Sequence, residues 1–260
     1  KMGVVRTDQW LLKHNYHPLE VCSEFLPYFK SVEKKALMHY LQQNGMYNSA
    51  TQGKRDCKLL AEEDICSKVE TLLEEYKKLW NGPDIPIFIF PIKKQSFFMR
   101  SHFKSGLAFS DKLFLFLSPR LNQHHLEALF IHEYHHVCRI KKQKKPMEEY
   151  TVADAIILEG LAEYTVNTIK GEKYLAPWTK QYSSKFLQSY WDSTFKENLL
   201  ILKSEKKHDQ IIYGRGQYPA MIGYCMGYHL VEKYVEEKGF SLKSSFTLTS
   251  DEMIDKYLRK

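Results

Sequence analysis

The chain has 260 residues, of which 43% are hydrophobic and 14% aromatic, and its formal net charge is +7. This apolar content can fill the core of one large domain or of two joined lobes, and it excludes a disordered chain. No run approaches the roughly 20 apolar residues of a membrane helix. The five cysteines are scattered, which argues against a disulfide scaffold and a thiolate zinc site. We therefore expect a cytoplasmic protein, with secretion after removal of a leader as the alternative.

The first third of the chain is expected to be helical. Apolar residues recur at helical spacing from residue 17 to about residue 43 and again from about residue 56 to residue 80. In the second segment one apolar stripe contains Ile65, Val69, Leu72, Leu73, Tyr76 and Leu79. The sequence Asn-Gly-Pro-Asp at residues 81–84 should end this helix.

A small β-sheet is predicted next. Residues 85–90 are expected to form a strand at a constrained or edge position, because prolines accompany them. Residues 96–99 and 106–117 should continue the sheet, with a turn at 110–112 and an end at Ser118-Pro119. The sheet would then have three or four strands.

The rest of the chain is expected to be helical. Helices are predicted at about residues 121–139, 149–169, 178–202, 219–238 and 250–259. Thr249 and Glu252 form a capping-box pattern at the start of the last one. We divide the chain into a helical region 1–82, a core 83–170 and a helical region 171–260, packed as one compact unit.

The pattern H-E-x-x-H lies in the helix predicted directly after the sheet. His132 and His136 are four residues apart, so they project from one helical face and can share a metal ion. Glu133 is adjacent to the first histidine and is placed to take a proton from a water at that metal, as metal-assisted peptide hydrolysis requires. We predict zinc ligands at His132 and His136 and a general base at Glu133.

A third zinc ligand is expected downstream, because a catalytic zinc keeps three protein ligands and one open position. Residues 156–164 read Ile-Ile-Leu-Glu-Gly-Leu-Ala-Glu-Tyr, with two carboxylates four apart on an otherwise apolar helix. Buried carboxylates need partners, and a metal and a ligand histidine would serve. We predict Glu159 as the ligand and Glu163 as the partner of a ligand histidine. The alternative is an exposed carboxylate face.

These motifs resemble the gluzincin peptidases, in which the glutamate of an E-G-[FL]-A segment is the third zinc ligand. More closely, the chain resembles predicted zinc-dependent peptidases of bacterial genomes that were described as a domain of unknown function. The segments that carry this resemblance are V-V-R-T-D-Q-W-L, H-E-Y-H-H-V-C-R, E-G-L-A-E-Y and G-Y-C-M-G-Y-H. It covers most of the chain and implies one zinc ion and a peptide or protein substrate.

The resemblance also implies a tyrosine at the site. Gluzincin aminopeptidases carry a Y-x-x-G segment whose phenol stabilises the oxyanion, and Tyr224 to Gly227 match it. The alternatives are that Tyr224 is a packing residue, or that Arg215, Tyr218 or His229 takes this role. The G-x-M-E-N segment of the aminopeptidases does not occur, so removal of single N-terminal residues is not implied.

The expected fold is α+β and zincin-like, with a small mixed sheet packed on the H-E-x-x-H helix and a largely helical remainder. We expect the substrate to bind in extended form along an edge strand at Gly106, Leu107 and Ala108, where glycine permits close backbone approach. The alternative is that this segment is a fully paired inner strand or hairpin arm.

Parts of the sequence are compatible with two other functions. A regulatory or interaction protein could keep zinc for stability alone, but a structural site has no use for a base such as Glu133 beside its ligand. The lysine runs at residues 141–145 and 203–207 could bind nucleic acid, but no nucleic-acid motif accompanies them, so we expect no such partner.

Overall fold

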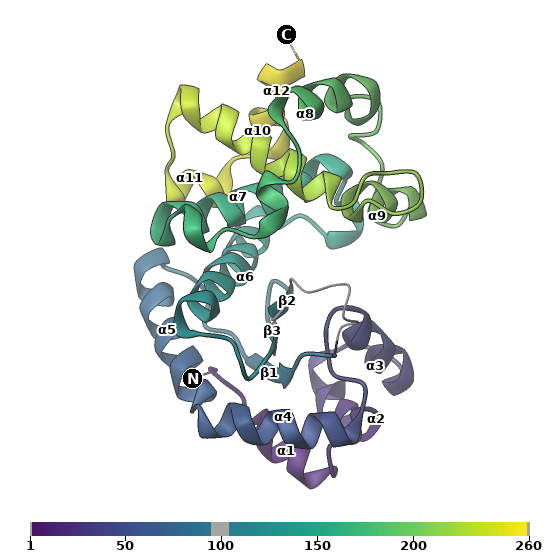
Figure 1. The fold of residues 1–260 in the computed structure, drawn as a ribbon, viewed down its shortest axis with the longest axis vertical. Coiled ribbons are helices and arrows are strands. Elements are labelled where there is room, and N and C mark those ends of the chain that lie inside the picture. The colour runs from purple at the N-terminus through teal and green to yellow at the C-terminus, as the bar shows by residue number, and fades with distance from the viewer. Residues whose placement is uncertain (1, 95–103, 259–260) are drawn as a thin grey trace. The chain divides into compact units, whose positions relative to one another are not determined.

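The computed structural model describes residues 2–94 and 104–258 (Figure 1). They form two compact units, Lys1–Val137 and Cys138–Lys260. The boundary falls inside one helix, α6 (Gln123–Gln143). The division into regions 1–82, 83–170 and 171–260 remains a prediction.

Five helices precede the sheet in the first unit. They are α1 (Thr7–Lys13), α2 (Pro18–Val21), α3 (Lys34–Gln43), α4 (Ala50–Glu62) and α5 (Ile65–Trp80). The predicted helix from residue 17 to about 43 is interrupted by a 3₁₀ helix that contains Pro27, since proline cannot donate a backbone hydrogen bond. The helix expected from about residue 56 is likewise two helices, because Asp64 adopts a left-handed conformation between α4 and α5.

Helix α5 buries the predicted apolar stripe, with one exception. Its buried residues are Ile65, Val69, Leu72, Leu73, Tyr76 and Trp80. The prediction is wrong at Leu79, which is 65% exposed. The adjacent Trp80 is buried instead, and its ring stacks on Tyr134 at 5.7 Å. The helix ends at Trp80 as predicted, with Asn81 in the left-handed conformation.

The described residues contain one mixed sheet of three strands in the order β1-β3-β2. The strands are β1 (Ile87–Pro91), β2 (Lys104–Ala108) and β3 (Leu113–Leu117), with β1 parallel and β2 antiparallel to β3. The predicted edge position of the first strand, the turn at 110–112 and the end at Ser118 are confirmed. The segment 96–99 lies outside the described residues.

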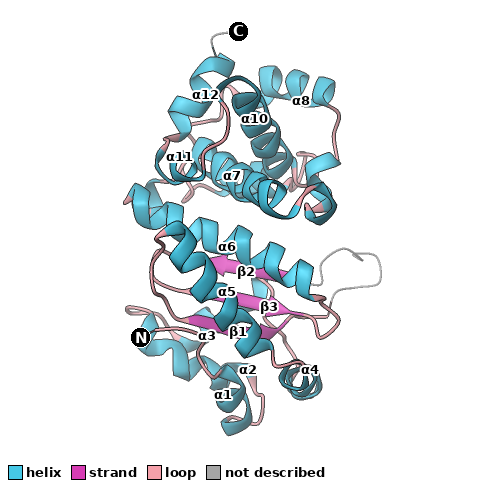
Figure 2. Cartoon of the chain, turned by 90° about the vertical axis from the view of Figure 1, so that its left-hand side faces the viewer, coloured by secondary structure: helices cyan, strands magenta, loops and turns pink. Residues whose placement is uncertain are grey.

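The sheet uses both of its faces for packing. Phe88, Phe90, Phe114 and Phe116 alternate with aliphatic residues along β1 and β3 and join the core formed by the N-terminal helices. Figure 2 shows α5 and α6 on the other face. Because every residue of β1 and β3 is buried, the sheet forms a rigid base beside α6.

The second unit is built around α7 (Val152–Lys170) and α10 (Ile222–Lys238), which pack closely. A Cβ at Gly160 would collide with the backbone oxygen of Gly227, and a Cβ at Gly227 would collide with the backbone oxygen of Ile156. The two helices therefore meet backbone to backbone at a pair of glycines. A capping box of Thr151 and Asp154 fixes the start of α7.

The remaining helices are α8 (Ser184–Tyr190), α9 (Lys206–Tyr213), α11 (Leu242–Thr247) and α12 (Ser250–Leu258). The prediction of one helix over 178–202 is wrong, because α8 passes into a π-helical turn at residues 191–195. Helices α9 and α11 were not predicted. The capping box of Thr249 and Glu252 is confirmed by hydrogen bonds of 2.7 and 3.2 Å between each backbone N–H and the other side chain. No helix in the described ranges has the length and apolar character needed to cross a membrane.

Candidate active site

Helix α6 carries the H-E-x-x-H motif on a well-buried surface. Asn122 begins the helix by accepting a hydrogen bond from the backbone N–H of His125 at 3.0 Å. One turn of helix separates His132 from His136, and their ring centroids lie 4.6 Å apart. His132 is half-buried and His136 is 6% exposed. The predicted pairing of two imidazoles on one helical face is therefore present.

Glu133 lies against strand β2. A Cβ added at Gly106 would lie 2.5 Å from Oε1 of Glu133 and closer still to its Cγ and Cδ. The absence of a side chain at Gly106 is therefore what makes room for the Glu133 side chain, which is 8% exposed. The packing of β2 against α6 thus brings together Gly106 and Glu133, two of the residues that the sequence predicted for the site.

Replacing Gly106 by alanine should displace the Glu133 carboxylate, because the new methyl group would occupy its place. If Glu133 is the general base, we expect kcat for peptide hydrolysis to fall by about 10²-fold, the effect of a misplacement near 1 Å. Zinc content and the thermal midpoint should change little, and both are measured beside the kinetics. Full activity of Gly106→Ala would contradict a role for the Glu133 position.

Helix α7 presents the two carboxylates of the E-G-L-A-E segment. Glu159 is half-buried, and Glu163, one turn later, is 4% exposed. The backbone N–H of Ala176 donates a hydrogen bond to Oε1 of Glu163. Glu163 is therefore a buried carboxylate with a fixed orientation, and the alternative of an exposed carboxylate face does not hold for it.

The predicted ligands lie close together. One donor atom from each of His132, His136 and Glu159 lies within 4.8 Å of the other two, and the described residues contain no other group of three such donors. Two imidazoles and one carboxylate are a donor set that catalytic zinc sites use. The residues present thus fit a zinc ion.

The predicted tyrosine has a neighbour that the sequence did not point to. Tyr224 lies in the first turn of α10, with its ring 5.3 Å from Trp178 and 5.8 Å from Tyr213. Tyr213 is the last residue of α9, which was not predicted as a helix. Of the proposed substitutes, Arg215 lies over the Tyr213 ring at 4.8 Å. His229 instead lines a cavity with α8 and α12, and burial lowers its pKa.

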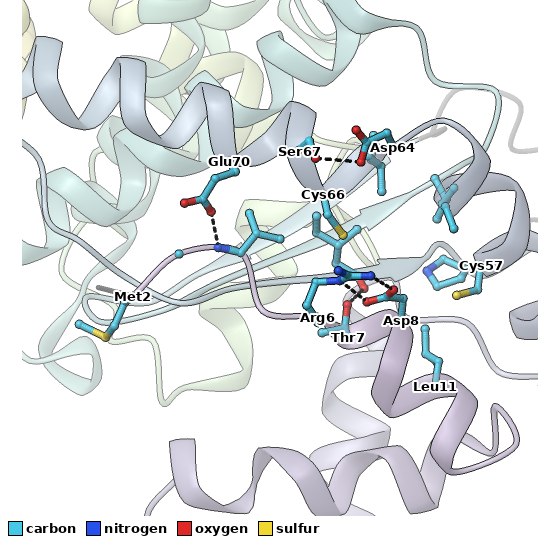
Figure 3. A pocket seen from close by; sticks show the side chains of 17 residues that line it. Met2, Arg6, Thr7, Asp8, Leu11, Cys57, Asp64, Cys66, Ser67 and Glu70 are labelled. Atoms are coloured by element: carbon cyan, nitrogen blue, oxygen red, sulfur yellow. Dashed lines mark hydrogen bonds and ion pairs between the residues drawn. The ribbon is translucent and has the colours of Figure 1, made fainter.

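A cavity of about 450 Å³ lies in the first unit, and none of these residues lines it (Figure 3). The V-V-R-T-D-Q-W-L segment forms one wall, where Glu70 accepts a hydrogen bond from the backbone N–H of Val4 at 2.7 Å. Burial raises the pKa of the Cys57 thiol in this cavity to about 11. The thiol is therefore protonated near neutral pH, and this segment serves to attach the N-terminus to β1.

Comparison with known proteins finds one matching family and two similar proteins. The family described as "Predicted Zn-dependent protease (DUF2268)" matches residues 65–255. The uncharacterized protein YjaZ of Bacillus subtilis is 33% identical over 262 residues, covering 99% of this chain and 100% of the relative. The uncharacterized protein YjfC of the same organism is 24% identical over 139 residues, covering 50% and 46%. No solved structure matches.

Proposed function

Because the chain belongs to the family of predicted zinc-dependent proteases, we propose that it hydrolyses peptide bonds at a single zinc ion held by His132, His136 and Glu159. The observation that supports this most directly is the convergence of these three donors beside Glu133. A purely structural zinc site would more often be closed by four side chains and would have no use for a base next to a ligand.

Each residue of the proposed site would have a separate role in hydrolysis. Zinc, when bound, polarises the scissile carbonyl and lowers the pKa of a water molecule. Glu133 accepts a proton from the attacking water and passes it to the leaving amine, and Gly106 leaves it the space to do so. Glu163, fixed by the N–H of Ala176, would orient a ligand histidine. Tyr224 would contribute a phenol for the oxyanion.

Strand β2 is the proposed binding site for the backbone of the substrate. Among the described residues it pairs with β3 alone, and its other edge would offer backbone groups to an extended peptide. The candidate residues Gly106, Leu107 and Ala108 are half-buried. Since backbone pairing requires no particular sequence, it would hold many peptides in extended form beside Glu133. We propose that this edge binds the substrate and that the protein acts in the cytoplasm, where its five free cysteines would stay reduced.

Removing and restoring the metal tests the proposal. Dialysis against a chelator should abolish digestion of a peptide library, and one equivalent of zinc per chain should restore it. If one equivalent of magnesium restored the peptide digestion, a metal site with two histidine ligands would be contradicted, because magnesium prefers oxygen ligands.

A thermal melt and a nucleic-acid binding assay on the same protein separate the two other functions. A zinc-stabilised interaction protein would bind one zinc and gain thermal stability but leave every peptide intact. A nucleic-acid-binding protein would bind DNA or RNA with an affinity that falls steeply as salt increases.

A further inference from the structure

The cavity in the first unit has an apolar base and a charged mouth (Figure 3). Its volume of about 450 Å³ is in the range of small-molecule binding sites. Leu11, Leu60 and Ile89 line the base and are 1%, 5% and 4% exposed. Arg6 and Asp64 are exposed lining residues, so they mark the mouth. None of the candidate residues for the zinc site lines this cavity.

The backbone groups of β1 point alternately to two different edges. The carbonyl of Pro86, just before β1, accepts a hydrogen bond from the N–H of Leu113 on β3 at 3.1 Å. The N–H of Ile92, just after β1, donates one to the carbonyl of Leu117 at 3.0 Å. Because bonded residues alternate along a parallel pair, the even-numbered residues of this segment bond β3. The odd-numbered residues therefore point their N–H and C=O groups to the opposite edge.

The N-terminal segment covers only part of that opposite edge. Ile87 donates a hydrogen bond to the carbonyl of Gly3 at 3.1 Å and accepts one from the N–H of Val5 at 2.9 Å. Two residues later, the carbonyl of Ile89 accepts a hydrogen bond from the Thr7 hydroxyl at 2.6 Å. No described residue accepts a hydrogen bond from the N–H of Ile89, which points to the same edge as its carbonyl. Ile89 and Thr7 both line the cavity.

This backbone N–H determines what the base of the cavity can bind. A buried N–H without an acceptor is rare in proteins, because it loses its hydrogen bonds to water without replacement. A carbonyl oxygen on a ligand would supply the acceptor. The lining beside Ile89 includes Leu11 and Leu60, which favour an apolar group on the same ligand.

The charged lining residues favour a cation at the mouth. They are three carboxylates and one guanidinium: Asp8, Asp64, Glu70 and Arg6. Arg6 is paired with Asp8 through hydrogen bonds of 2.9 and 2.6 Å, so these two charges offset each other. Asp64 and Glu70 lie on the other wall in Figure 3, where each accepts a hydrogen bond from a neutral donor. The described lining therefore has an excess of negative charge, which attracts an ammonium group and repels a carboxylate.

We propose that this cavity binds the N-terminal residue of a short peptide with an apolar first side chain. Such a residue combines an ammonium group, a carbonyl oxygen and an apolar group within a few bonds. The ammonium group lies at the mouth near Asp64, the carbonyl oxygen accepts the N–H of Ile89, and the side chain contacts Leu11 and Leu60. This site is separate from the residues of the proposed function, and the inference does not depend on that function.

A set of small amides tests each feature of the ligand. Leucinamide carries all three groups, and it should bind saturably to the full-length protein, shift the amide resonance of Ile89 and slow its hydrogen exchange. Glycinamide lacks the apolar side chain and should bind about 10- to 100-fold more weakly. N-acetylleucinamide lacks the positive charge and should bind about 5-fold more weakly. Leucine should also bind more weakly than leucinamide, because its carboxylate adds a negative charge.

Variants of the lining locate the site. Asp64→Asn keeps an acceptor for the Ser67 hydroxyl and suits the left-handed backbone at φ 49°, and it should weaken leucinamide binding about 5-fold. Ala61→Phe should weaken it at least 10-fold, because the ring enters the cavity from an exposed position on α4. Glu63→Gln is the matched control and should bind leucinamide as the parent protein does, because Glu63 is an adjacent exposed carboxylate that does not line the cavity.

Several outcomes would overturn the inference. They are equal affinities for leucinamide and glycinamide, an Ile89 resonance that does not shift, or leucinamide binding that Ala61→Phe leaves unchanged. Tighter binding of leucine than of leucinamide would likewise overturn the assignment to a peptide N-terminus.

A chelator separates this site from the proposed zinc site. Leucinamide should bind with the same affinity in its presence, because His132, His136 and Glu159 do not line the cavity. Loss of binding with the chelator would place the ligand at the metal and overturn the inference. If leucinamide binds as predicted and the zinc-loaded protein cleaves no peptide, the proposed function alone fails.

Discussion

Glu133→Gln is expected to abolish nearly all peptide hydrolysis while leaving the fold and the zinc in place. Glutamine has the shape of glutamate and fits the space beside Gly106, but it cannot accept the proton of the attacking water. General-base catalysis contributes about 10²- to 10⁴-fold, so kcat should fall by that factor. The measurement is single-turnover hydrolysis of a peptide, with zinc content determined on the same preparation.

Glu75→Gln is the control for the loss of a carboxylate, because Glu75 is exposed on α5. It should hydrolyse peptides at the rate of the parent protein. Turnover that is unchanged in a zinc-replete Glu133→Gln protein would eliminate Glu133 as the base, whereas loss of both zinc and activity would indicate that Glu133 contributes to metal binding.

His136→Ala is expected to cause the largest change in zinc affinity. Loss of an outer hydrogen-bonding partner of a metal ligand typically weakens binding about 10- to 100-fold, and loss of a ligand itself should exceed that. The rise in thermal midpoint that zinc gives the parent protein should disappear, because this stabilisation depends on affinity for the folded state. Competition with a zinc-binding dye, together with a thermal melt, measures both.

His124→Ala provides the comparison on the same helix, because His124 is exposed near the start of α6. Its zinc affinity should equal that of the parent protein. Zinc binding by His136→Ala as tight as that of the parent would show that the metal, if bound, uses other donors.

Local patterns in the sequence predicted the elements that bear the candidate residues. Helical periodicity gave α6, α7 and α10 to within a few residues, and alternation with a turn gave β2 and β3. The roles of the site residues stay predictions. The contact of Gly106 with Glu133 could not be predicted, because it depends on how a strand packs against a helix, and no local pattern encodes that packing.

The misses have local physical causes. Asp64 gave no signal for a helix break, because aspartate adopts the left-handed conformation only where the surrounding structure requires it. Helix α9 begins with Lys206 and Lys207 and has only eight residues, so its short buried stripe could not be separated from a loop. Missing α9 meant that Tyr213 had no predicted position, and the partner of Tyr224 was overlooked.

The glycine pair of α7 and α10 bears on how relatives of this protein are to be recognised. Gly160 belongs to the E-G-L-A-E segment, yet its side-chain position is filled by the backbone of Gly227. Gly160 in the E-G-L-A-E motif is therefore required for the close packing of α7 against α10. Glu133 in the H-E-x-x-H motif, in contrast, has a catalytic role in our proposal. A homologue that lost its enzymatic activity could therefore keep Gly160 and lose Glu133. Sorting homologous chains by the residue at position 133, and not by the glycine, would then separate peptidases from proteins that retain only the architecture.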